Sequence, residues 1–105
     1  MSRSTHFTQT YDDLKNQIIN EIYNLVRHED DQILELLETH RCKALITGGD
    51  EYDPQIIHDL YINEEDRLMA SAGVYEDDTE YDINEFEVPF LIEILNSVEK
   101  HITED

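Results

Sequence analysis

The amino-acid sequence predicts an α+β domain: N-terminal helices, then a three- to four-stranded antiparallel meander, then a C-terminal helix. Apolar residues recur at three- and four-residue steps in the first and last parts of the chain, which is typical of amphipathic helices. In the middle they alternate with polar residues, and polar turns separate the alternating runs. Together these patterns place helices on one face of an antiparallel sheet.

The N-terminal part predicts two helices behind a short tail. Residues 1–9 are polar, and we expect a mobile tail there, followed by a single domain over 10–105. Helical periodicity then runs through Tyr11, Leu14, Ile18, Ile22, Leu25 and Val26, and it resumes at Ile33, Leu36 and Leu37. An acidic cluster between the two runs supplies residues that cap helices. We therefore expect helices over 10–28 and 31–40, with one continuous helix as the alternative.

The middle of the chain predicts the strands. Residues 43–47 form a short apolar run that ends at two glycines. Residues 56–62 and 68–75 alternate, and the polar turn 63–66 joins them into a predicted hairpin. The first run places Ile57, Asp59 and Tyr61 on one face, and on the other it places Ile56, His58, Leu60 and Ile62. A further strand follows, with Tyr81 and Ile83 facing inward.

The C-terminal helix begins near Pro89, because proline suits the first turn of a helix. Three segments of the last half of the chain resemble small acidic proteins of unknown function from bacterial mobile elements and phages. They are Leu60-Tyr61-Ile62, Tyr81-Asp82-Ile83-Asn84-Glu85-Phe86 and Leu91-Ile92-Glu93-Ile94-Leu95. The resemblance implies a genomic context and no particular activity.

Charge is the outlying property of the sequence. The 105 residues contain 26 acids against 7 Lys and Arg, for a net charge of −19. Most of this charge belongs to residues 44–99, where Arg67 is the one basic residue. Such a field repels polyanions, so neither direct nucleic-acid binding nor binding to anionic membranes is expected. The expected partner is a basic protein, such as a nucleic-acid-binding enzyme.

Location follows from two further features of the sequence. It contains no apolar run long enough to span a membrane. Its one cysteine, Cys42, excludes an internal disulfide and fits a reducing compartment. We therefore expect a cytoplasmic protein.

The sequence gives no support for catalysis, and we expect no enzyme activity, no cofactor and no metal. Carboxylate pairs arise by chance among so many acids. Cys42 lies between Arg41 and Lys43, which would lower a thiol pKa, but it also precedes a buried strand, where cysteine is a small apolar filler. His40 and Cys42 lack the second ligand pair of a zinc site.

Calcium is the one metal for which the spacing of acids gives partial support. Acids at alternate positions from Asp78 match the first half of a calcium loop, but Ile83 stands where that loop needs glycine. A strand with acids on its solvent side explains the same spacing, and weak calcium binding at 76–85 stays open.

The acids themselves form the predicted binding surface. They cluster at loops and interleave with tyrosines, which often anchor interfaces. The predicted contact residues are Asp50, Glu51, Tyr52, Asp53, Glu64, Glu65, Asp66, Tyr75, Glu76, Asp77, Asp78, Glu80, Tyr81 and Asp82.

These features predict a non-enzymatic acidic binding protein that imitates nucleic acid and inhibits a basic nucleic-acid-handling protein. Phage or mobile-element anti-defence, or immunity against a nuclease, would use such a protein. The alternative is a homo-oligomeric assembly module. It would form a dimer through the apolar stripe of the N-terminal helices, and its acidic surface would only confer solubility.

Overall fold

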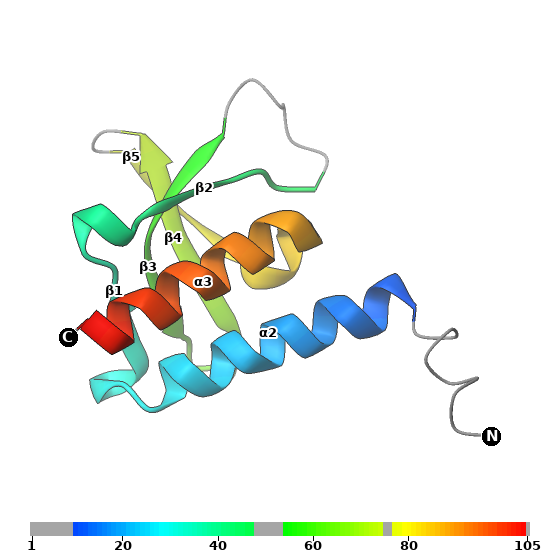
Figure 1. The fold of residues 1–105 in the computed structure, drawn as a ribbon, viewed down its shortest axis with the longest axis horizontal. Coiled ribbons are helices and arrows are strands. Elements are labelled where there is room, and N and C mark those ends of the chain that lie inside the picture. The colour runs from blue at the N-terminus through cyan, green and yellow to red at the C-terminus, as the bar shows by residue number, and fades with distance from the viewer. Residues whose placement is uncertain (1–9, 48–53, 75–76, 105) are drawn as a thin grey trace.

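A computed structural model describes residues 10–47, 54–74 and 77–104 of the chain. Within these residues, helix α2 (Tyr11–Arg27) precedes a five-stranded antiparallel sheet, and helix α3 (Val88–Glu104) follows it (Figure 1). The predicted α+β class and the C-terminal helix are therefore confirmed, whereas the predicted count of three to four strands is wrong, because residues 33–35 add a strand to the sheet. The predicted tail over residues 1–9 lies outside the described residues.

Helix α2 forms where the sequence predicts its first helix. Thr10 caps it: its side chain accepts a hydrogen bond from the backbone N–H of Asp13, and the Asp13 carboxylate accepts one from the backbone N–H of Thr10. One side of the helix buries Ile18, Ile22 and Val26. The four-residue spacing of these three residues is what keeps them on a single face.

The second predicted helix, over 31–40, is wrong. Asp31 and Gln32 have φ values of 57° and 58°, which lie in the left-handed region and end the helical path. Strand β1 (Ile33–Glu35) follows, with Leu34 buried and its two neighbours exposed. The spacing of the apolar residues here fits a helix as well as a strand, and pairing with a distant strand decides between them.

The strands form a meander with a divided edge. Strands β3 (Gln55–Ile62), β4 (Leu68–Val74) and β5 (Asp77–Asp82) are joined in sequence order, which confirms the predicted hairpin and the strand after it. Strand β1 pairs with the C-terminal half of β3, and β2 (Cys42–Ala44) pairs with its N-terminal half. The edge beside β3 is thus made by two short strands with a single turn of 3-10 helix between them.

A β-bulge in β3 corrects the predicted alternation of residues 56–62. Ile57 pairs with Ala72, while Asp59 pairs with the very next residue of β4, Ser71. His58 is therefore an extra residue, and it reverses the inward and outward positions on its N-terminal side. Ile57, not Ile56, joins Leu60 on the buried face.

Both helices pack on one side of the sheet, where α3 contacts β2 and α2 contacts β3 (Figure 1). The core between the layers contains fully buried side chains from each of them, including Ile22, Leu60, Phe86, Leu91 and Ile94. The other side of the sheet has no such cover among the described residues.

Candidate functional site

We call the side of the sheet that faces away from both helices the outer face. Directly paired residues of neighbouring strands project to the same side, so the strand register fixes its composition. Besides the bulged His58, it carries Ile33, Glu35, Lys43, Ile56, Asp59, Tyr61, Met69, Ser71, Gly73, Asp78, Glu80 and Asp82.

Strand pairing brings acids from three strands together on this face. Glu35 of β1 pairs with Asp59 of β3, Asp59 pairs with Ser71 of β4, and Ser71 pairs with Glu80 of β5. These four residues form one row across the sheet. We call the five carboxylates of the face the outer acids: Glu35, Asp59, Asp78, Glu80 and Asp82.

The bulge and a glycine bring Asp78 over the centre of the outer face. Asp78 of β5 pairs with Gly73 of β4. Because glycine has no side chain, nothing on β4 separates the Asp78 carboxylate from β3. Its Oδ1 lies 3.4 Å from Nε2 of His58, the bulged residue of β3. That contact lacks the geometry of a hydrogen bond, and among the described residues His58 Nε2 has no hydrogen-bond partner. The pair becomes an ion pair only when the imidazole is protonated.

Glu80 reaches across β4 in the same way. It pairs with Ser71, a small residue, and its Oε1 accepts a hydrogen bond of 2.5 Å from the Tyr61 hydroxyl of β3. Burial, followed by this hydrogen bond and the charge of Glu80, raises the pKa of Tyr61 to about 12. Tyr61 therefore stays neutral and leaves the negative charge of Glu80 in place.

Negative charge is crowded on the outer face. The pKa of Asp59 is raised, first by partial burial and then by the charges of Glu35 and Asp78, while His58 and Arg41 act in the opposite direction. Like charges that disfavour one another in this way are relieved by an added cation. The face is therefore electrostatically suited to a cationic group.

Two basic residues, Arg41 and Lys43, lie at one corner of this face. A hollow of about 560 Å³ lies there, and its lining includes Arg41 and Lys43 together with Ile56 and His58. The acidic part of the face thus extends from the centre toward β5, away from β2.

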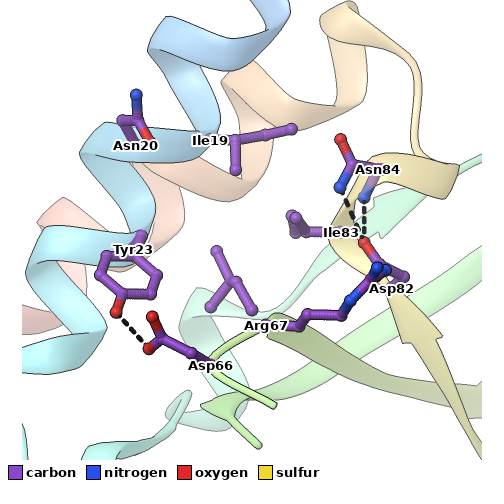
Figure 2. A pocket seen from close by; sticks show the side chains of 9 residues that line it. Ile19, Asn20, Tyr23, Asp66, Arg67, Asp82, Ile83 and Asn84 are labelled. Carbon is purple, nitrogen blue, oxygen red and sulfur yellow. Dashed lines mark hydrogen bonds and ion pairs between the residues drawn. The ribbon is translucent and has the colours of Figure 1, made fainter.

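A groove of about 460 Å³ lies at the end of the sheet where the β3–β4 turn meets α2 (Figure 2). The Tyr23 hydroxyl donates a hydrogen bond to Asp66 Oδ1 across this groove. This hydrogen bond is the main cause that raises the pKa of Tyr23. On the other side, Arg67 donates to Asp82 at 2.9 Å, and both the backbone and the side chain of Asn84 donate to the same carboxylate. Partial burial alone would raise the pKa of Asp82, but these donors lower it.

The structure divides the predicted contact residues into groups. Glu64 and Glu65 are exposed at the β3–β4 turn, whereas Asp66 and Asp82 have the internal partners just described. Tyr81 lies on the helix side of β5, with its ring 6.0 Å from that of Phe86. The predicted residues outside the described part of the chain are Asp50, Glu51, Tyr52, Asp53, Tyr75 and Glu76, together with the side chain of Asp77.

Two outer acids, Glu35 and Asp59, were missing from the predicted surface. Glu35 falls in the segment that was expected to be helical, and Asp59 is the single acid within its strand. The alternation of residues 56–62 did place Asp59 on the same face as Tyr61, and that signal was available. Their proximity to each other comes from strand pairing, which no local pattern reports.

Cys42 behaves as the filler interpretation predicts. It lies opposite Ile57 on the buried side of β2, and burial raises the pKa of its thiol, although an interaction with Ser97 lowers it. The raised pKa favours the filler interpretation over activation of the thiol by Arg41 and Lys43. Among the described residues, no three His, Cys, Asp or Glu side chains converge to hold a metal ion.

The apolar stripe of the N-terminal segment is divided between the core and the surface. Ile18, Ile22 and Val26 of α2 are buried in the core, as is Leu36. Its exposed members lie toward the two ends of the stripe: Tyr11, Leu14, Ile33 and Leu37. Dimer formation through this segment stays a prediction.

No protein-family model matches the chain, and searches of curated proteins and of solved structures found no match. Neither helix in the described part of the chain has the length and apolar character to span a membrane.

Proposed function

We propose that this protein is a non-enzymatic acidic binding protein whose outer face imitates a nucleic-acid backbone and occupies a basic surface of a nucleic-acid-handling protein. The observation that carries the proposal is the gathering of acids from β1, β3 and β5 on one side of the sheet, with no helix covering it among the described residues. Crowded carboxylates gain most from a cationic partner, because its charges relieve their mutual repulsion.

The spacing of the outer acids supports imitation of phosphates. Asp78 and Glu80 are alternate residues of β5, and a strand advances about 6.6 Å for every two residues. Asp82, the next alternate residue, already has Arg67 as its ion-pair partner. Successive phosphates of a nucleic-acid strand are separated by a comparable distance. Asp59 and Glu35 extend the negative charge from Glu80 across the sheet, in the row that strand pairing makes.

The net charge of −19 supports fast capture of a basic partner. Complementary fields raise association rates by one to three orders of magnitude, and the effect falls as salt is added. Inhibition of a bacterial defence nuclease, or immunity against a nuclease toxin, are biological settings in which such capture is useful. The resemblance to proteins of phages and mobile elements favours these settings.

Competition with nucleic acid tests the proposal. In a pull-down, host proteins that bind the immobilised wild type are compared with those that bind an Asp78→Lys/Glu80→Lys variant, called the outer-face variant. The control is Glu21→Lys/Glu99→Lys, which makes the same change of net charge on exposed positions of the helices. We expect the retained partner to bind DNA or RNA. The wild type and the control should displace it from its nucleic acid, whereas the outer-face variant should not. A partner that the outer-face variant inhibits equally well contradicts the proposal.

A further inference from the structure

Strand β5 ends the sheet on one side. Among the described residues it pairs with β4 alone, and it does so over six consecutive residue pairs with no bulge. Asp77–Asp82 also contains no proline. An edge of this kind leaves a row of backbone N–H and C=O groups able to pair with another strand.

The backbone groups on this edge can be assigned to particular residues. The backbone N–H of Asp82 donates to Glu85 Oε2 at 2.9 Å, so it does not point toward β4. In an antiparallel strand, the backbone groups of alternate residues point to the same side. Asp78 and Glu80 therefore direct their N–H and C=O groups to the free edge.

The β3–β4 hairpin gives the same assignment independently. The backbone N–H of Asn63 donates to the carbonyl of Arg67 at 3.0 Å, which turns Arg67 toward β3. The alternation along β4 then turns Ala70 and Ala72 toward β5, where they pair with Tyr81 and Thr79. The residues of β5 between those pairs face away from β4.

Asp78 and Glu80 therefore supply both the free backbone groups and the charges of this edge. Their side chains lie on the outer face, and that of Asp78 is 52% exposed. A residue placed opposite either of them in a new strand would lie about 5.5 Å away, measured between Cα atoms, with its side chain on the same face. A second copy of β5 would set acid against acid, which is unfavourable, whereas lysine or arginine there would be favourable.

We propose that the free edge of β5 accepts an extended, basic segment of the partner protein as an added strand, with lysine or arginine opposite Asp78 and Glu80. The inference rests on the proposed function for the basic character of the partner, and it adds the mode of binding. The residue between the two cations would lie on the other side of the new strand, beside Thr79 and the half-buried Tyr81. An apolar residue suits that position, because Tyr81 already packs against Phe86. The preferred segment alternates basic and apolar residues.

A short labelled peptide that alternates lysine with valine tests the mode of binding by fluorescence anisotropy. One control peptide has the same composition with its lysines adjacent. A second is methylated on the backbone amides that would face β5. We expect methylation to weaken binding at least about tenfold, since it removes two backbone hydrogen bonds without changing the charge. Equal affinities for the methylated and unmethylated peptides overturn strand addition.

Two substitutions at one position make the same test on the protein. Asp78→Asn removes the charge and keeps the edge-facing N–H, whereas Asp78→Pro removes both, and proline is tolerated where an edge N–H faces solvent. We expect the proline variant to bind the peptide about fivefold more weakly than the asparagine variant, because it lacks one further backbone hydrogen bond. Equal binding by two folded variants overturns the inference. If circular dichroism shows that the proline variant is unfolded, the methylated peptide decides.

The outcomes separate this inference from the proposed function. Peptide binding that depends on charge but is insensitive to methylation removes the added strand and leaves an acidic surface for a basic partner. A wild-type dimer in light scattering that Asp78→Pro abolishes would assign the edge to a second copy and overturn the inference. Loss of binding to the outer-face charge variant, together with sensitivity to methylation, supports both.

Discussion

The bulge at His58 predicts that two neighbouring isoleucines contribute very differently to stability. Ile57 is fully buried between the sheet and the helices, whereas Ile56 is half-buried on the outer face. Ile57→Ala removes three carbon groups, at about 0.8 kcal/mol of transfer free energy each, and it leaves a cavity in addition. We expect it to lower the free energy of unfolding by about 3–4 kcal/mol. Ile56→Ala should cost less, about 1.5–2 kcal/mol, because part of that side chain is already in water and its removal leaves no closed cavity.

Urea unfolding followed by circular dichroism measures both changes, and equal m-values would show that the unfolded states are comparable. In a thermal scan, the Ile57 variant should lose roughly 15–25 °C of Tm, given several degrees per kcal/mol for a domain of this size. A larger loss for Ile56→Ala than for Ile57→Ala would refute the bulge. Uninterrupted alternation would turn His58 toward the helices, away from Asp78, and remove it from the outer face.

Three further predictions concern single groups. Because folding raises the pKa of Asp59, its ionised form opposes folding. Asp59→Asn should therefore raise the Tm at neutral pH. The gain should shrink as the pH falls through the raised pKa and disappear below the ordinary pKa of the unfolded carboxyl, where both states bind the proton. A destabilised variant at neutral pH contradicts this. Tyr61 should ionise near pH 12 in an ultraviolet titration, and Glu80→Gln should lower its pKa, since burial and the Glu80 contact both raise it; an unchanged pKa would exclude the contact. Cys42 should react with a thiol reagent at neutral pH more slowly than in the urea-unfolded chain, because burial raises its pKa; a faster reaction would support activation by the flanking basic residues.

Local signals predict the elements that local interactions define. The Thr10 capping box marks the start of α2, and its apolar period gives the rest of that helix. The β3–β4 turn is also local, because the Asn63 side chain accepts hydrogen bonds from the backbone N–H groups of Glu65 and Arg67. Proline in the first turn marks α3 in the same way.

Elements that depend on distant partners were not predictable from such signals. Ile33–Glu35 becomes a strand because β3 is available to pair with it, and its residues are separated from that partner by more than twenty positions in the chain. The bulge likewise arises between two paired strands. A sequence that alternates on both sides of His58 gives no indication of which residue is extra.

The candidate site was predictable in its charge and only partly in its geometry. The acids of β5 were identified, because alternate acids beside inward residues indicate the solvent side of a strand. Their position over the centre of the sheet depends on small residues of β4, Ser71 and Gly73, and on partners in β3. Only the register of the paired strands shows that Glu35 and Asp59 lie in the same row as Glu80.

The most direct test of the central claim is the salt dependence of partner binding for two variants of equal net charge. Asp78→Lys/Glu80→Lys changes the outer face, and Glu21→Lys/Glu99→Lys changes the helices. Affinity for the captured nucleic-acid-handling partner is measured by calorimetry over a series of salt concentrations. If the outer face makes the contact, the first variant binds much more weakly and shows a shallower dependence on salt, while the second resembles the wild type. Equal losses in both variants would show that only the bulk charge of the protein matters, and would contradict a binding surface on the outer face.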